Sequence, residues 1–169
     1  KHLEKIGCFF HPKNKSSLPL VIEGTTMPLA QTHLEILGSA QVKSSILLAA
    51  LNTSGTTSVI EKKTSRNHTE IFLKKIGANI KVKKLKKGNL ITLEGQKNLY
   101  SFKSNISSDP SSSAFFIALT LLTPGSKLLI KNVNCNSTRI GFVNILKKKM
   151  NANIIIKFLK KRKDNEPVG

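Results

Sequence analysis

A polar turn followed by an apolar run organises this chain: Ser39-Ala40-Gln41-Val42-Lys43-Ser44-Ser45 and then Ile46-Leu47-Leu48-Ala49-Ala50-Leu51. Ser39 is a favoured N-cap residue, and the twelve residues after it contain neither Gly nor Pro. The segment Asn52-Thr53-Ser54-Gly55 supplies a stop, so the pattern predicts one helix over residues 39–51. From Ile46 onward this helix is apolar on almost every side, which is typical of a helix packed inside a protein.

The first turn of this helix has the opposite character. Ser39, Gln41, Lys43, Ser44 and Ser45 gather hydroxyl, amide and ammonium groups at the end where free backbone N–H groups and the helix dipole favour an anion. The local pattern leaves two interpretations open. One is an anion-binding site, and the other is a capped core helix whose polar first turn is only solvated.

Length and composition are those of a globular chain. Its 169 residues could hold one ordinary domain or parts of two, and 39% hydrophobic residues suffice for a core. Residues 1–7 resemble the end of a helix and residues 166–169 close no element, so we expect a fragment of a longer protein. No apolar run reaches the eighteen or so residues of a membrane span, and we expect no signal peptide. Two cysteines match neither a metal-binding spacing nor a disulfide framework, which favours a cytoplasmic location.

The formal charge of +19 raises the question of nucleic-acid binding. Only three of the 28 basic residues are Arg, and the joint excess of Lys, Asn and Ile is what an AT-rich coding sequence produces. One Tyr and no Trp leave the basic runs without the aromatic side chains on which single strands stack. We therefore expect no nucleic-acid partner, whereas attraction of small phosphorylated anions stays plausible.

The chain repeats itself with a shift of about seventy residues. Residues 39–61 align without a gap to residues 109–131. Lys5-Ile6-Gly7, residues 75–80 and residues 149–154 are three copies of a helix end that runs into a strand. Ser65-Arg66 returns as Thr138-Arg139, and each pair opens the second helix of its unit.

The middle copy shows the whole unit. It predicts a strand near residues 31–37, the helix described above, a strand at 56–61, and a second helix from Asn67 to Ile76 whose inner face holds Ile71, Phe72 and Ile76. A hairpin follows, with strands at 80–85 and 90–94.

The unit is therefore βαβαββ, and the chain holds the end of one unit, a whole second unit and most of a third. Because one unit cannot enclose a core, the units are expected to pack with their apolar helices inward. Residues 105–109 form the expected joint, which predicts one domain over residues 1–105 and the start of another over 106–169. The charged segment 160–165 is expected to be solvated.

Four motifs occur in the order found in the 5-enolpyruvylshikimate-3-phosphate synthase family, which this sequence resembles. They are Ser39 to Ser44, Thr64-Ser65-Arg66-Asn67-His68-Thr69-Glu70, Ser108-Asp109-Pro110-Ser111-Ser112 and Asn136-Ser137-Thr138-Arg139-Ile140-Gly141. The resemblance implies an α/β architecture of repeated βαβαββ units, the enolpyruvyl transferase (inverse α/β barrel) fold, with buried helices. The chain would be an internal fragment that covers parts of two domains.

The family transfers the enolpyruvyl group of phosphoenolpyruvate to the 5-hydroxyl of shikimate 3-phosphate and releases phosphate, with no metal or organic cofactor. By resemblance, Ser39 and the backbone N–H of Ala40 bind the shikimate phosphate. Gln41 lies between the two substrates, and Arg66 is a further phosphate ligand suited by its planar fork. The family's catalytic acid, base and Lys lie outside this chain, so no catalytic residue is assigned here.

Several positions depart from the family pattern without removing a ligand. Asn67 stands where Asp is usual, Ser108 replaces a Gly, and Gly38 replaces another small residue. His68 is expected to be structural, because the motif places it inside the second helix, and Asp109 is expected to be the N-cap of its own helix.

Two alternatives to this function stay open. One is the enolpyruvyl transferase that acts on UDP-N-acetylglucosamine, and the other is a non-enzymatic basic module that binds anions. We expect the full-length enzyme to be a monomer, and we expect this fragment to be inactive on its own.

Overall fold

The computed structural model describes residues 1–14, 17–159 and 166–169; the charged segment 160–165 lies outside the described residues. The chain separates into two compact units, Lys1–Ser101 and Phe102–Gly169. The expected division into two domains at residue 105 stays a prediction. Within the described ranges, no helix combines the length and the apolar content that crossing a membrane requires.

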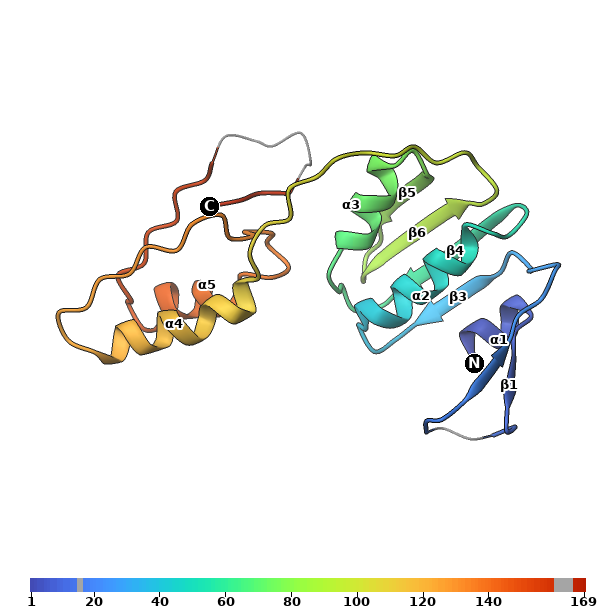
Figure 1. Cartoon of the computed structure of the whole chain (residues 1–169), viewed down its shortest axis with the longest axis horizontal. Coiled ribbons are helices and arrows are strands. Elements are labelled where there is room, and N and C mark those ends of the chain that lie inside the picture. The colour runs from blue at the N-terminus through green and yellow to red at the C-terminus, as the bar shows by residue number, and fades with distance from the viewer. Residues whose placement is uncertain (15–16, 160–165) are drawn as a thin grey trace. The chain divides into compact units, whose positions relative to one another are not determined.

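The first unit contains the complete βαβαββ repeat that the sequence predicts (Figure 1). A four-stranded sheet has the order β3-β4-β6-β5, in which β3 and β4 are parallel and the other neighbours are antiparallel. Its elements are β3 (Thr32–Glu35), α2 (Ala40–Ala50), β4 (Thr56–Glu61), α3 (His68–Lys75), β5 (Asn79–Lys84) and β6 (Asn89–Glu94).

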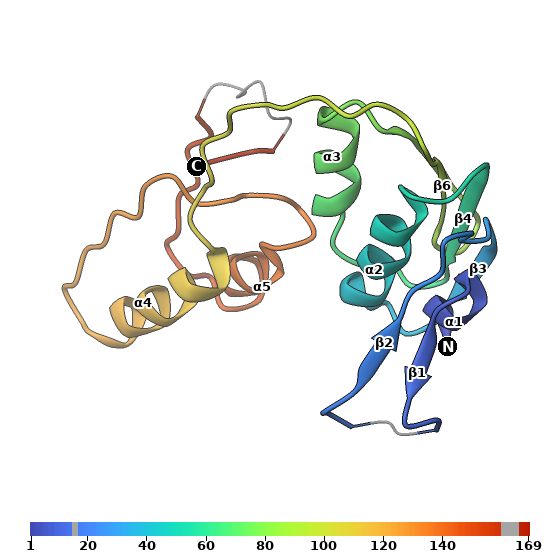
Figure 2. The same ribbon diagram turned by 45° about the vertical axis from the view of Figure 1, so that its right-hand side comes forward.

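The core of this unit lies between the sheet and its two helices, which cover one face side by side (Figures 1 and 2). Ile46, Leu47 and Ala50 of α2 are completely buried there, as the apolar half of the predicted helix requires. Burying one such large aliphatic side chain stabilises the fold by about 1.5–3 kcal/mol. The remaining members of the core come from β4, α3, the turn before β5, β5 itself and β6: Val59, Leu73, Ala78, Ile80, Ile91 and Leu93.

The inner face of α3 differs from the sequence prediction. Phe72, expected to point inward, is 50% exposed, whereas Leu73 is fully buried and Glu70 is buried beside it. The prediction was therefore wrong for Phe72 and omitted Leu73 and Glu70, whereas Ile76, which it also placed on the inner face, packs against the core. A buried ion pair holds Glu70 on the inner side and fixes the rotation of the helix, so that Phe72 turns outward.

The backbone confirms the repeat at its three helix ends. Gly7 after α1 (His2–Ile6), Gly77 after α3 and Asn151 after α5 (Gly141–Lys149) all have positive φ, at 113°, 89° and 49°. Gly and Asn are the residues that adopt this left-handed conformation with the least strain. After α1 the chain forms the antiparallel pair β1 (Phe9–His11) and β2 (Val21–Glu23), which is the hairpin expected at the end of a repeat.

The second unit contains two predicted helices, α4 (Pro110–Leu122) and α5. The strands predicted after them, near residues 126–131 and from residue 151 onward, were wrong for the described part of the unit, where only isolated bridges such as Ser108 with Val133 occur. A strand needs a hydrogen-bonded neighbour, and no described segment of this unit supplies a ladder for either.

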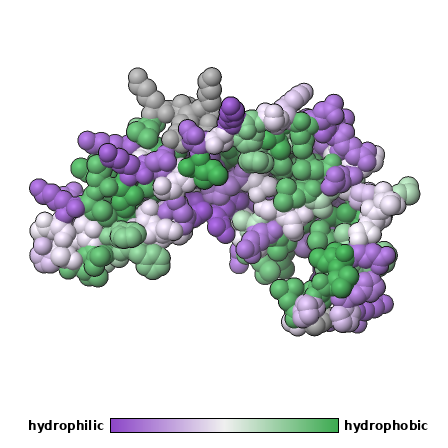
Figure 3. All heavy atoms as spheres, viewed as in Figure 1, coloured by the Kyte–Doolittle hydropathy of each residue, from purple (hydrophilic) through white to green (hydrophobic). Residues whose placement is uncertain are grey.

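Apolar side chains of α4 are exposed because no sheet covers them within the described part of the second unit. Hydrophobic atoms are visible on the surface where α4 lies (Figure 3). The expectation that helices are buried therefore holds for α2 and fails for α4 in this chain. The exposed side chains are Phe115, Phe116, Leu119 and Leu122.

Candidate anion-binding site

The site begins at the edge of the sheet where the two parallel strands end. Glu35 of β3 and Glu61 of β4 are register partners, and each strand leads directly into the loop before a helix. The N-termini of α2 and α3 therefore start from the same edge. In open α/β sheets this edge is where ligands bind.

A tight turn positions the start of α2. The Glu35 carboxylate accepts hydrogen bonds from the backbone N–H groups of Leu37 at 2.9 Å and Gly38 at 2.8 Å. Ser39 then caps the helix, because its Oγ accepts from the N–H of Val42 at 3.3 Å. This confirms Ser39 as the N-cap that the sequence predicts.

The predicted ligands on α2 lie at the surface. Ser39 and Ala40 are half-buried and Gln41 is exposed. The first N–H groups of a helix have no partner inside it, so this end can donate to an anion, and the helix dipole favours negative charge there.

Lys43 does not join Ser39, Ala40 and Gln41 at the surface. The prediction that its ammonium group helps to bind an anion at the first turn of α2 was wrong. Its side chain is 1% exposed and its Nζ lies 3.1 Å from Glu61 Oε1 and 2.7 Å from Glu70 Oε1. Lys43 comes four residues after Ser39 on the same helix face as Leu47 and Ala50, so it points toward the sheet. Removing one member of such a buried group destabilises a protein by about 3–5 kcal/mol.

Glu61 connects this buried group to the loop before α3. Its carboxylate accepts from the backbone N–H of Ser65 at 2.8 Å and from Asn89 Nδ2 at 3.0 Å. Burial by itself raises the pKa of the Glu61 carboxyl, but hydrogen bonds from Ser65, Asn89 and Lys43 outweigh it and hold this pKa below its ordinary value. Glu61 is therefore a stable anion at the centre of the network.

The network brings the start of α3 against the start of α2. Ser44 Oγ and Thr69 Oγ1 are 2.6 Å apart, and Glu70 reaches Lys43 in the same turn of α3. Arg66 follows the anchored Ser65 and precedes α3, so the structure places it at the same edge as the first turn of α2. Arg66 is exposed and forms no ion pair with any described residue.

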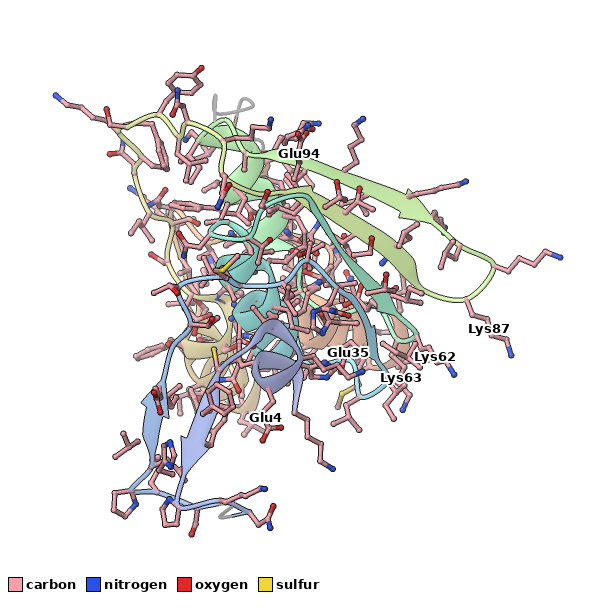
Figure 4. The ribbon with its side chains drawn as sticks, turned by 90° about the vertical axis from the view of Figure 1, so that its right-hand side faces the viewer. Glu4, Glu35, Lys62, Lys63, Lys87 and Glu94 are labelled. Carbon is pink, nitrogen blue, oxygen red and sulfur yellow. The ribbon has the colours of Figure 1, made fainter. Side chains whose placement is uncertain are left out.

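Two further cations lie at this edge that the sequence analysis missed. Lys62 donates its backbone N–H to the carbonyl of Glu35 at 2.9 Å, and Lys63 Cβ lies 3.1 Å from the position that a Cβ on Gly38 would take. Figure 4 shows Glu35, Lys62 and Lys63 together at this end of the sheet. A signal for them was available, because Lys62 and Lys63 directly follow the strand that ends at Glu61.

The arrangement suits binding of a small anion. It combines the N-terminus of α2, the planar fork of Arg66 and two exposed lysines. The nearby carboxylates Glu35, Glu61 and Glu70 already bind backbone N–H groups or Lys43. Across the described residues, no group of His, Cys, Asp and Glu is arranged to hold a metal ion.

The repeat places an equivalent pair of residues in the second unit. Asp109 caps α4 by accepting from the N–H of Ser112 at 3.1 Å, as the sequence predicts. Arg139, the counterpart of Arg66, forms an ion pair with Asp109 and donates to Ser111 Oγ at 3.0 Å. This second Arg is therefore already neutralised.

A family model described as EPSP synthase (3-phosphoshikimate 1-carboxyvinyltransferase) matches residues 1–166. The chain belongs to the EPSP synthase family. The resemblance carried by the four sequence motifs is thereby confirmed, together with the fold class that it implied.

Individual members of the EPSP synthase family agree with this assignment. A 3-phosphoshikimate 1-carboxyvinyltransferase from Petrotoga mobilis is 44% identical over 164 residues, which is 96% of this chain and 37% of the relative. One from Roseobacter denitrificans is 39% identical over 145 residues, 86% of this chain and 32% of the relative. A solved EPSP synthase from Acinetobacter baumannii matches with a TM-score of 0.80 at 33% identity, covering 99% of this chain and 36% of that one.

The chain thus spans about a third of the length of these EPSP synthases. The relatives are named for the phosphoshikimate acceptor, so the alternative that acts on a UDP-linked amino sugar is not favoured.

Proposed function

We propose that this chain is part of an enzyme that transfers the enolpyruvyl group of phosphoenolpyruvate to the 5-hydroxyl of shikimate 3-phosphate and releases phosphate. The observation that carries the proposal is the match of residues 1–166 to the EPSP synthase family. The anion-binding arrangement at the start of α2 and α3 supports it, because the acceptor substrate carries a phosphate group.

In this proposal the first unit binds the phosphate of shikimate 3-phosphate. Ser39 and the backbone N–H of Ala40 donate to it from the helix N-terminus, and Arg66 adds a bidentate charge-assisted contact. Gln41 is exposed on the same turn and lies between the two substrates, where its amide can donate to one and accept from the other. Fixed donors of this kind also stabilise charge that develops during transfer.

The acid and base groups and the remaining phosphoenolpyruvate ligands come from the rest of the longer enzyme. Residues 1–105 belong to its first domain and residues 106–169 begin its second. We further propose that the whole enzyme is a cytoplasmic monomer that needs neither metal nor organic cofactor and binds neither nucleic acid nor membrane.

A phosphate-release assay of the family-length enzyme tests the function. With phosphoenolpyruvate as donor, we expect turnover with shikimate 3-phosphate and none with UDP-N-acetylglucosamine; the reverse preference would assign the other transferase. The basic-module alternative predicts a third result, namely no turnover with either acceptor and salt-dependent binding to duplex DNA in the micromolar range.

The 169-residue chain is expected to be inactive in the same assay. It carries the phosphate-binding half of the site, and the exposed apolar face of α4 favours aggregation. We expect at most millimolar binding of shikimate 3-phosphate, measured by calorimetry. Enolpyruvyl transfer by the purified chain would contradict the assignment of the catalytic groups to the rest of the enzyme.

A further inference from the structure

The buried group Lys43, Glu61 and Glu70 is not explained by stability alone. Its side chains are 1%, 1% and 7% exposed, and well-packed apolar residues stabilise an interior as well as a buried ion group does. The group also leaves one polar atom, Glu70 Oε2, without a hydrogen-bond partner among the described residues. A role in function, beyond stability, would account for three charged side chains in the interior of the first unit.

The three side chains join the segments that carry the candidate anion ligands. Lys43 lies in α2, one helical turn after Ser39. Glu61 holds the backbone of Ser65, the residue next to Arg66. Glu70 lies in the first turn of α3, directly after the Arg66 loop.

We propose that Lys43 is a positioning residue that sets the distance between Arg66 and the N-terminus of α2, and thereby the fit of the substrate phosphate. The inference rests on the proposed function. Lys43 acts through Glu61, Ser65 and Glu70, because its own ammonium group is buried and contacts the two carboxylates.

Electrostatics explain why Lys43 has this effect. Glu61 Oε1 and Glu70 Oε1 both lie within 3.1 Å of the same ammonium nitrogen, so without it two buried carboxylates face each other and repel. Ser65 would shift with Glu61 because it donates its backbone N–H to that carboxylate. Arg66, the next residue, would then shift relative to the start of α2, and small displacements of a binding group lower affinity strongly.

The test uses Lys43→Met in the family-length enzyme, which keeps an unbranched side chain one atom shorter and removes its charge. We expect the KM for shikimate 3-phosphate to rise roughly ten- to a hundredfold, with the KM for phosphoenolpyruvate within about twofold of wild type. In an Arg66→Ala background, Lys43→Met should add less than about twofold, because both changes remove the same contact.

The matched control is Lys97→Met, which removes an exposed ion pair with Glu94 in the same unit and should change neither KM. If Lys43→Met does not fold, Lys43→Gln provides the same test, because its amide also removes the positive charge between the two carboxylates while it can still donate a hydrogen bond. Equal changes in both KM values, no change, or a full additional effect on top of Arg66→Ala would overturn the positioning role. A wild-type enzyme that does not use shikimate 3-phosphate would instead overturn the proposed function, and this inference with it.

Discussion

The starts of α2 and α4 occupy equivalent places in the repeat and have different electrostatic character. Ser39, a neutral residue, caps α2, and Arg66, in the loop that leads into α3, makes no ion pair with a described residue. Asp109, an anion, caps α4, and it binds Arg139, which also donates to Ser111. The charge of the cap residue thus distinguishes the two helix N-termini. The start of α2 can bind an external anion, whereas at the start of α4 the Asp109 carboxylate already occupies that role.

The helices also differ in their support. Ile46 of α2 is completely buried against the sheet, whereas its counterpart Phe116 of α4 is 61% exposed. The first unit contains its sheet, and the described part of the second contains only isolated bridges. Within the described part of this chain, only α2 therefore starts from a helix that is anchored against a sheet.

The largest expected effect tests this difference in support. Ile46→Ala should lower the stability of the first unit by about 3–5 kcal/mol, because it removes buried methyl groups and leaves a cavity. Phe116→Ala should change the second unit of the 169-residue chain by less than about 1 kcal/mol, because most of that ring already contacts water. Hydrogen exchange of α2 and α4 peptides, followed by mass spectrometry, measures the two separately. Similar losses of protection would show that α4 is packed as tightly as α2.

The next prediction compares the two arginines. In the family-length enzyme, Arg66→Ala should weaken shikimate 3-phosphate by about 2–4 kcal/mol, as expected for a desolvated charge-assisted pair, and phosphoenolpyruvate far less. Arg139→Ala should leave both Michaelis constants within about twofold, because its charge is neutralised by Asp109. Steady-state kinetics decide the matter, and unchanged constants for Arg66→Ala would remove this residue from the site.

Placing an acidic cap on α2 should give its N-terminus the electrostatic character of the N-terminus of α4. Ser39→Asp should keep α2 folded, because Asp caps a helix as well as Ser does. Its carboxylate would repel the substrate phosphate and pair with Arg66, so we expect affinity for shikimate 3-phosphate to fall by roughly ten- to a hundredfold. Isothermal titration with the substrate measures this change. The matched control is Ser39→Asn, which caps the helix without charge; an equal loss there would show that the charge of the cap is irrelevant.

The smallest effect concerns pH. The pKa of Glu61 is held below its ordinary value of 4.5 in the folded state, so its contribution to stability is fully present above pH 4.5 and is lost as the pH falls through the folded pKa. Urea unfolding monitored by circular dichroism between pH 6 and pH 3 should show this loss, and Glu61→Gln should flatten it. An equally steep loss in Glu61→Gln would assign the acid sensitivity to other carboxylates.

The repeat, the helix of residues 39–51 and the Ser39 and Asp109 caps were predictable from sequence, because each depends on residues that are neighbours along the chain. The EPSP synthase family was equally accessible, since its motifs are short and local. The inner face of α3 and the absence of strand ladders in the described part of the second unit were not predictable from the sequence. Which face of a helix is buried and whether a strand forms depend on the segments that pack against them.

The sequence by itself therefore determined the order of the elements in the first unit, the polar first turn of α2 and the presence of Arg66 after Ser65. Only the tertiary structure decided that Lys43 points inward, that Arg66 lies at the edge where α2 begins, and that Lys62 and Lys63 lie there too. The physical reason is that a buried charge is stable only with its partners. Those partners, Glu61 and Glu70, come from segments that are distant in the sequence and meet only in the folded unit.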